Sequence, residues 1–110
     1  MITIDTDNNN ITIIKKDTAS LEIALDNYQL TTGDTVIFTI AREVEQETPL
    51  VQKTVTIFTA EGRAVINLTT EDTDLDIGSY KYDIQIDTRD GRRDTVIGPA
   101  KFKVIGGVTY

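Results

Sequence analysis

The sequence predicts an all-β domain, and three observations support that prediction. Threonine, isoleucine and valine occupy 41 of the 110 positions, and such β-branched side chains pack well on a pleated sheet. From Tyr80 to Asp87, apolar and polar residues alternate without an error. A period of two over this length is typical of a strand with one buried and one solvated face. No helical periodicity longer than one turn accompanies it.

Composition argues against several classes of function. The chain has 18 acidic and 11 basic residues, and its net charge of −7 disfavours binding to nucleic acid or to an anionic membrane surface. No apolar run approaches the roughly 20 residues that cross a bilayer, so membrane insertion is not predicted. The first residues lack the basic start and apolar stretch of a secretory signal. At this length the chain fits one domain with a core of its own.

The N-terminal ten residues allow two interpretations. Ile2 and Ile4 alternate with polar residues, and the following run of aspartate and asparagine favours a turn. This segment is either a frayed end, or an arm or edge strand that pairs with a neighbouring subunit through Ile2 and Ile4. The predicted organisation is an arm or edge strand at 1–10, a β-sandwich at 11–106 and a short tail at 107–110.

Apolar alternation predicts the strands of the first part of the chain. They are expected at residues 11–14, 21–25, 35–41, 50–59 and 64–68. Gly33-Asp34 is a turn signal before the third of them. Their inward faces are expected to carry Leu21, Ile23 and Leu25, then Val36, Phe38 and Ile40, then Ala64, Ile66 and Leu68. In the segment 50–59, Val55 and Ile57 share one face, although Phe58 breaks the strict pattern.

The last part of the chain begins with a predicted crossing turn. Thr70 is placed to cap one helical turn, with Leu75 beneath it. A strand over 80–87 follows, with Tyr80 and Tyr82 facing the core. Asp90-Gly91 predicts a hairpin, and strands at 93–97 and 100–104 flank Pro99, which belongs at a bulge or an edge because proline donates no ladder hydrogen bond.

Asp76-x-Gly78-x-Tyr80 resembles the corner that opens strand F of immunoglobulin-type sandwiches. In that corner a tyrosine hydroxyl bonds to upstream backbone. Asp76 is also the last of three alternating carboxylates, with Asp72 and Asp74. Such a run can wrap calcium or form a solvated acidic turn, and both interpretations stay open. No metal site is predicted beyond that alternative.

Two features suggest a binding surface. Arg89, Asp90, Gly91, Arg92 and Arg93 form the tip of the predicted hairpin, which is either a solvated, internally compensated loop or a contact with an acidic partner. Tyr28 lies outside the alternating strands and is available for binding, for example by stacking on a sugar.

Catalysis is not predicted. The chain has no histidine and no cysteine, so a nucleophile would have to be a serine, threonine or lysine activated by another group. Neither a Gly-x-Ser-x-Gly sequence nor a phosphate-binding glycine loop occurs. We therefore predict a protein that is not an enzyme and that uses no cofactor.

Four segments together resemble immunoglobulin-like modules of phage structural proteins, similar to the N-terminal domain of phage baseplate upper proteins. These segments are Gly33 to Ile40, Leu68 to Thr73, Gly78 to Gln85 with Asp90-Gly91, and Thr95 to Val104. The resemblance covers about residues 11–105. It implies an antiparallel immunoglobulin-like β-sandwich of about seven strands with Greek-key connections, in which we interpret residues 35–41 as strand B.

The resemblance also implies a function. Such a module would be a non-enzymatic virion structural protein of the tail, baseplate or capsid surface, made in the host cytoplasm. Its expected partners are other virion proteins in a symmetric assembly, in which it is itself oligomeric, and a host cell-surface glycan during attachment. Two alternatives remain: a carbohydrate- or cell-surface-binding β-sandwich module, and an accessory domain of an enzyme.

Overall fold

The computed structural model describes residues 2–5, 9–25, 28–42 and 48–107. These residues are all-β, as the sequence predicts, and none of them lies in a helix. The described residues therefore contain no helix that could cross a membrane. The strands are β1 (Ile2–Asp5), β2 (Asn10–Ile14), β3 (Ala19–Ile23), β4 (Thr35–Ala41), β5 (Val51–Val55), β6 (Ala64–Leu68), β7 (Gly78–Asp87) and β8 (Arg93–Ile105).

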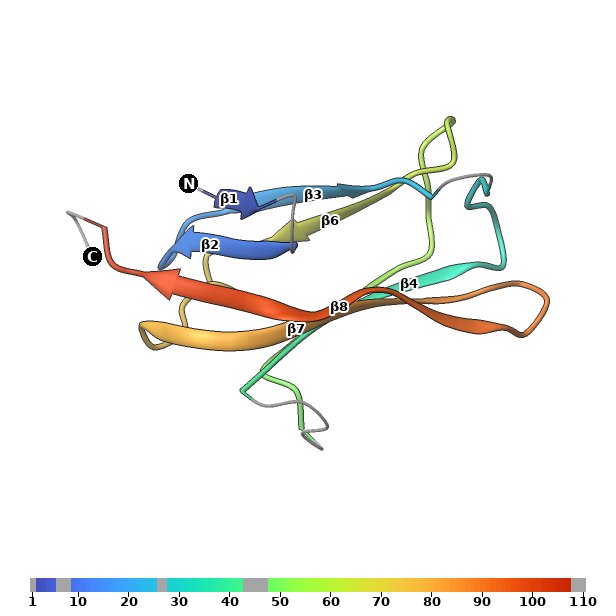
Figure 1. Cartoon of the computed structure of the whole chain (residues 1–110). Coiled ribbons are helices and arrows are strands. Elements are labelled where there is room, and N and C mark those ends of the chain that lie inside the picture. Colours follow the sequence, from blue (N-terminus) through green and yellow to red (C-terminus); the bar gives the residue numbers. More distant parts are fainter. Residues whose placement is uncertain (1, 6–8, 26–27, 43–47, 108–110) are drawn as a thin grey trace.

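The strands form two sheets, and Figure 1 shows β3 and β6 of the smaller sheet above β4, β7 and β8 of the larger one. Six strands form the larger sheet in the order β1-β2-β8-β7-β4-β5, and the antiparallel pair β3-β6 forms the smaller one. The chain passes from the larger sheet to the smaller one and back twice, through β3 and then through β6. The result is a sandwich-like arrangement of two layers.

The prediction that all strands are antiparallel is wrong at one position. β2 pairs in parallel with β8, with Ile11 opposite Phe102 and Ile13 opposite Val104. These strands lie at opposite ends of the chain, so no short hairpin constrains their relative direction. The larger sheet is therefore mixed.

The core fills the space between the layers. Its buried side chains are supplied by alternate residues of both sheets, because successive side chains of a strand point to opposite faces. Phe38, Tyr82 and Phe102 come from the neighbouring strands β4, β7 and β8 and form its aromatic centre, with ring centroids 5.6 to 6.3 Å apart. Around them lie Ile11, Ile13, Leu21, Ile23, Leu30, Val36, Ile40, Val51, Ala64, Ile66, Leu68, Tyr80, Ile84, Ile86, Ala100 and Val104.

The predicted alternation is confirmed in β7 and fails after β5. Tyr80 and Tyr82 are each 3% exposed and face the core. In contrast, β5 ends at Val55, and Ile57 is 87% exposed, whereas Phe58 packs against the core. A period-two pattern predicts facing only while the backbone remains extended. The prediction that Ile57 shares the face of Val55 is therefore wrong, since Val55 packs against the core.

The crossing turn before β7 differs in detail from the prediction. Thr69, and not Thr70, is the capping residue: its backbone N–H donates to Asp72 Oδ2 at 2.7 Å, and its Oγ1 accepts from the Asp72 N–H at 3.2 Å. The turn is no regular helix. Thr73 is fully buried in it and donates from Oγ1 to the Asp17 carbonyl at 2.7 Å, while Leu75 is only half-buried.

Pro99 lies at an irregularity in the β7–β8 pairing, as predicted. The register shifts between Tyr82 and Ile84, and no residue of β8 is paired opposite Asp83. Gly98 packs so closely there that a Cβ would lie 2.6 Å from the Tyr82 carbonyl oxygen, and its φ is +100°. Only glycine combines that conformation with that approach.

β1 is an edge strand of the larger sheet. It pairs antiparallel with β2 of the same chain, with Ile2 opposite Ile13 and Ile4 opposite Ile11. The structure thus has an edge strand at Ile2–Asp5 that pairs within its own chain, and pairing of this segment with a neighbouring subunit stays a prediction. The side chains of Ile2 and Ile4 lie outside the described part of the chain, as do residues 108–110 of the predicted tail.

Candidate functional site

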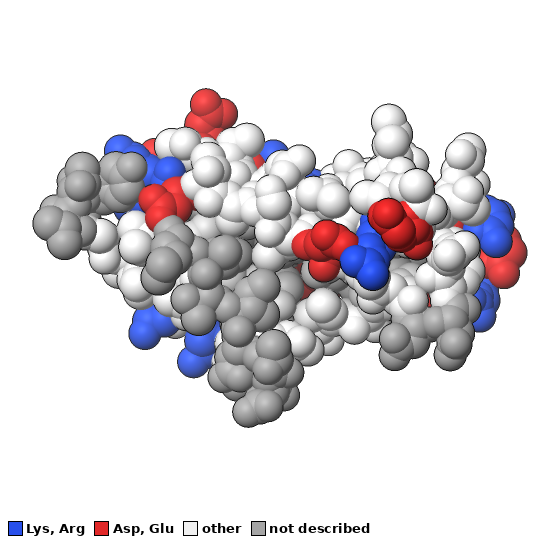
Figure 2. Space-filling view, turned by 90° about the horizontal axis from the view of Figure 1, so that it is seen from above, with Lys and Arg blue, Asp and Glu red and all other residues white. Residues whose placement is uncertain are grey.

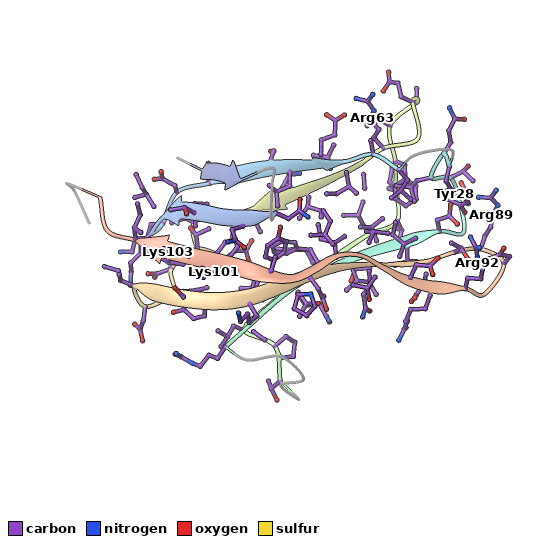
Figure 3. The ribbon with its side chains drawn as sticks, in the orientation of Figure 1. Tyr28, Arg63, Arg89, Arg92, Lys101 and Lys103 are labelled. Atoms are coloured by element: carbon purple, nitrogen blue, oxygen red, sulfur yellow. The ribbon has the colours of Figure 1, made fainter. Side chains whose placement is uncertain are left out.

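Three loops meet at the end of the molecule where the β7–β8 hairpin turns (Figure 3). They are the connection between β3 and β4, the connection between β5 and β6, and the hairpin tip itself. Leu30 donates its backbone N–H to the Gly62 carbonyl at 3.0 Å, which joins the first two loops. Arg89 donates its backbone N–H to Asp34 Oδ1 at 2.8 Å, which joins the first loop to the hairpin tip.

Asp34 is the centre of this loop end. It is 1% exposed, and its carboxylate accepts hydrogen bonds from the Tyr28 hydroxyl at 2.8 Å and the Thr31 backbone N–H at 3.0 Å. The Arg89 guanidinium forms an ion pair with Oδ2 at 3.1 Å. The same guanidinium donates to the Tyr28 hydroxyl at 2.9 Å and lies 5.4 Å from the centre of the tyrosine ring. Asp34, Tyr28 and Arg89, the loop-end cluster, therefore bind one another.

The electrostatics of the cluster follow from these contacts. Burial raises the pKa of Asp34, but the backbone hydrogen bonds of Thr31 and Arg89, with the Tyr28 hydroxyl and the Arg89 charge, outweigh it and hold the pKa below its ordinary value. Burial and the hydrogen bond to Asp34 raise the pKa of Tyr28. Asp34 is consequently a carboxylate at neutral pH, and Tyr28 is a protonated donor to it.

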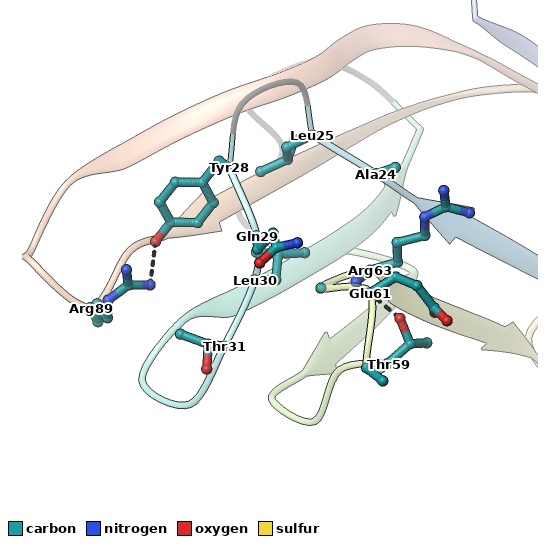
Figure 4. Close-up of a pocket in the computed structure, with 12 residues that line it drawn as sticks. Ala24, Leu25, Tyr28, Gln29, Leu30, Thr31, Thr59, Glu61, Arg63 and Arg89 are labelled. Atoms are coloured by element: carbon teal, nitrogen blue, oxygen red, sulfur yellow. Dashed lines mark hydrogen bonds between the residues drawn. The ribbon is translucent and has the colours of Figure 1, made fainter.

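An open cavity of about 1000 Å³ lies beside the cluster (Figure 4). Tyr28 and Arg89 lie at one end of it, and Thr59, Glu61 and Arg63 lie at the other (Figure 4). Arg63 is paired with Glu22 at 2.7 Å, and its backbone N–H donates to Thr59 Oγ1 at 3.1 Å. The lining is polar and can offer hydrogen bonds to a small polar ligand or to a polar segment of a partner.

Tyr28 is less available than the sequence predicts. Its hydroxyl is bound to Asp34 and Arg89, and the Arg89 guanidinium lies over its ring. Stacking of a sugar on that face of the ring would require Arg89 to move. The interpretation of Tyr28 as a free binding residue is therefore wrong for this arrangement.

The predicted hairpin tip is exposed, and its arginines have partners within the chain. Thr88 donates its N–H to the Arg92 carbonyl at 2.8 Å, and Gly91 donates to the Thr88 carbonyl at 3.0 Å. Arg93 binds Asp87 with two hydrogen bonds of 2.7 and 2.9 Å. Arg92 lies 3.8 Å from Asp90. Arg89 belongs to the loop-end cluster, so Arg89, Asp90, Gly91, Arg92 and Arg93 are a compensated tip.

The corner at the start of β7 has the hydrogen bond that the sequence predicts. The Tyr80 hydroxyl donates to the carbonyl oxygen of Asp76, four residues upstream. Arg42 lies over the Tyr80 ring, with its guanidinium carbon 5.6 Å from the ring centre. Gly78 lies between the two partners as the first residue of β7. The corner holds the turn against the end of the core.

Replacing Tyr80 with phenylalanine is expected to lower the free energy of unfolding by about 1–3 kcal/mol, because the Asp76 carbonyl would lose its donor beside a buried ring. Urea unfolding followed by circular dichroism measures this change. The neighbouring Ser79→Ala, on the exposed face of the same strand, is the matched control and should change stability by less than about 0.5 kcal/mol. An unchanged urea midpoint for Tyr80→Phe would show that the corner hydrogen bond does not stabilise the fold.

The three alternating carboxylates of Asp72, Asp74 and Asp76 each form an ion pair with a different basic residue. Asp72 pairs with Lys53 at 2.7 Å, Asp74 with Lys15 at 3.5 Å and Asp76 with Arg42 at 4.0 Å. Among the described residues, no group of three or more acidic side chains is placed to hold a metal ion. Burial raises the pKa of Asp72, and the hydrogen bonds from Lys53 and Thr69 outweigh that effect and lower it. The geometry fits ion pairs that fasten the crossing turn to β2 and β5.

Asp34 was not recognised from the sequence as a site residue. Its only signal in the sequence was its place in the Gly33-Asp34 turn. That signal predicts a turn and says nothing about burial of the carboxylate. The Tyr82 hydroxyl is a second such case, since it donates to the Asn9 carbonyl and joins the N-terminal segment to the core. Both contacts join residues that are distant in the sequence or lie on separate loops, and no local pattern contains them.

Comparison with known proteins gives no match to a family model, to a curated protein or to a solved structure. The resemblance described from the sequence therefore has no relative to support it. A function has to be inferred from the residues and from the geometry of the fold.

Proposed function

We propose that the chain is an immunoglobulin-like β-sandwich with Greek-key connections. The strand order supports this proposal. In the immunoglobulin fold, strands C, F and G share one sheet, and strands B and E belong to the other. Here β4, β7 and β8 are neighbours in the larger sheet, and β3 and β6 form the smaller one. In this assignment Thr35–Ala41 takes the position of strand C, and not that of strand B as the sequence suggested.

The function that the geometry supports best is that of a non-enzymatic structural module. The observation that carries it is the mutual binding of Asp34, Tyr28 and Arg89. This cluster uses its polar groups to join two loops, and the basic side chains of the hairpin tip are likewise paired. A rigid loop end of this kind suits presentation to a partner.

Sheet edges offer a second means of attachment. β1 and β5 are the outermost strands of the larger sheet, so each has one side with no strand partner among the described residues. Unpaired edge strands can accept a strand from another chain. Docking through edges and loops, rather than in a deep cavity, is what an assembly module requires.

The biological setting we propose is a phage virion. The protein would dock on a symmetric tail, baseplate or capsid surface, be synthesised in the host cytoplasm and contribute to host attachment. The support for this setting is the sequence resemblance of the segments from Gly33 to Val104. The partners would be other virion proteins and, at the host surface, a glycan.

Particle association tests this proposal. Phage particles purified from cells that encode this chain should contain it at a fixed copy number relative to the major capsid and tail proteins, measured by quantitative mass spectrometry. Retention through a density gradient is expected. A protein found only in the particle-free lysate would overturn the virion setting.

The polar cavity favours a second candidate function, the binding of a cell-surface carbohydrate. Its lining by Gln29, Glu61 and Arg63 supplies donors and acceptors of the kind that fix sugar hydroxyls. A glycan array with the isolated protein tests it. Binding that is lost in Arg63→Ala would support this candidate, and an array without signal would reject it.

A further inference from the structure

The basic residues of the described chain divide into those with a partner and those without an ion pair. Seven described cations form ion pairs, which are Lys15–Asp74, Arg42–Asp76, Lys53–Asp72, Arg63–Glu22, Arg89–Asp34, Arg92–Asp90 and Arg93–Asp87. Lys16 also has a partner. Within the described part of the chain, Lys81, Lys101 and Lys103 have no ion pair.

These three lysines lie together on one surface. Lys81 of β7 and Lys101 of β8 are direct partners in the antiparallel register, and Lys103 lies two residues further along β8 on the same face. Their neighbours Tyr82, Ala100 and Phe102 face the core, so the lysines point to the outer face of the larger sheet. Figure 3 shows Lys101 and Lys103 at the opposite end of the molecule from Tyr28 and Arg89.

The arrangement is unfavourable for the isolated protein. Like charges placed directly opposite each other on adjacent strands destabilise a sheet, and Lys81 and Lys101 are such a pair. The nearest acidic residue on this face of β7 is Asp83, which forms no ion pair with them. Burial raises the pKa of Asp83. Among the described residues, these three ammonium groups thus have no counter-charge at ion-pair distance.

Small side chains flank Lys103 in the sheet. Lys103 is flanked by Ser79 of β7 on one side and by Thr12 of β2 on the other, and both side chains are small. Lys101 and Lys103 are exposed, and Lys81 is half-buried. An extended chain could therefore lie against this surface without a large side chain in its way.

We propose that Lys81, Lys101 and Lys103 form a docking surface for an extended acidic segment of a partner protein. Successive outward residues of a strand are about 6.6–7 Å apart, which equals the spacing of alternate carboxylates on an extended partner segment. Nucleic acid is disfavoured because its closely spaced phosphates select for a broad surface of many clustered basic residues, and this surface offers three. Figure 2 shows the molecule from above, where basic and acidic atoms are interspersed and no broad area of one charge is visible in the described part. This inference goes beyond the proposed function and holds outside a virion.

A peptide titration tests the inference. The probe is a fluorescent peptide of four Thr-Glu repeats, with four Thr-Gln repeats as its uncharged counterpart, measured by fluorescence anisotropy in 20 mM salt. Lys81→Gln, Lys101→Gln and Lys103→Gln combined should weaken binding of the glutamate peptide at least about tenfold, which corresponds to about 1.4 kcal/mol. In the wild-type protein, the backbone amide NMR signals of 79–83 and 100–104 should shift with the peptide.

A matched variant distinguishes an effect of the three-lysine surface from a general effect of net charge. Arg92→Glu and Arg93→Gln combined lowers the net charge by the same amount at two exposed, paired side chains and should change binding less than about threefold. An equal loss in both variants, or no binding of the glutamate peptide by the wild type, would overturn the inference. So would tighter binding of a 20-base-pair DNA duplex than of the peptide. Thermal unfolding of both variants checks that each is folded.

Discussion

Replacing Asp34 with alanine is expected to lower the free energy of unfolding by about 2–4 kcal/mol. The carboxylate is buried and accepts hydrogen bonds from Tyr28, Thr31 and Arg89, and its removal takes the shared acceptor from all three donors at once. Urea unfolding at pH 7 measures the change. Asp34→Asn keeps the shape but loses the charge, so it should cause a smaller loss in the same direction.

Asp74→Ala is the matched control for this prediction. Its carboxylate is 46% exposed and forms one ion pair, with Lys15 at 3.5 Å. Exposed pairs of this kind contribute about 0–1 kcal/mol. If Asp34→Ala were no more destabilising than Asp74→Ala, the loop-end cluster would not stabilise the loops. The proposal of a rigid loop end would then be rejected.

The effect of Asp34 should also depend on pH. The pKa of Asp34 is lower in the folded protein than its ordinary value, so the folded state binds this proton less readily than the unfolded state does. The stabilisation is therefore complete above the unfolded pKa and is lost as the pH falls through the folded pKa. The difference in free energy of unfolding between wild type and Asp34→Ala should be full at pH 7 and shrink below about pH 4. A difference that stays constant down to pH 2 would contradict this assignment.

Replacing Phe38 with alanine is expected to lower the free energy of unfolding by about 3–5 kcal/mol. Phe38 is fully buried, and its ring lies 5.6 Å from that of Tyr82 and 6.3 Å from that of Phe102, centre to centre. Three neighbouring strands would share the cavity left behind, and a close-packed core fills such a space only partly. Urea unfolding followed by near-ultraviolet circular dichroism, which reports on the tyrosines, measures the loss.

Ile57→Ala is the control for Phe38→Ala. Ile57 is 87% exposed, so its truncation should change the free energy of unfolding by less than about 0.5 kcal/mol. Phe38→Leu should lie between the two, because it removes less volume. A loss below about 1 kcal/mol for Phe38→Ala would mean that the aromatic centre does not hold β4, β7 and β8 together.

The sequence predicted those parts of the fold that depend on local periodicity. Alternation placed Val36, Phe38 and Ile40 on the buried face of β4. It placed Tyr80, Tyr82, Ile84 and Ile86 on the buried face of β7, as the structure has them. Ile57 was placed wrongly because its alternation continues in the sequence past the end of the strand at Val55. Periodicity carries no information about where the backbone stops being extended.

Strand pairing could not be predicted in the same way. The parallel contact of β2 with β8 joins residues about ninety positions apart. The candidate site depends on contacts of the same kind. The tip arginines were visible in the sequence, but their partners Asp34 and Asp87 were not, because ion pairs follow from the approach of separate loops and strands.

The sequence by itself determined that the protein is all-β and which faces of β4, β6 and β7 are buried, because these properties follow from side-chain chemistry at spacings of a few residues. The bond from Tyr80 to upstream backbone was expected from the resemblance to the immunoglobulin corner. Only the tertiary structure decided that Asp34 joins two loops, that the three acidic residues of the crossing turn bind separate cations, and that Lys81, Lys101 and Lys103 share one surface. These properties depend on which strands and loops become neighbours, because charges interact according to their distance in space and not along the chain.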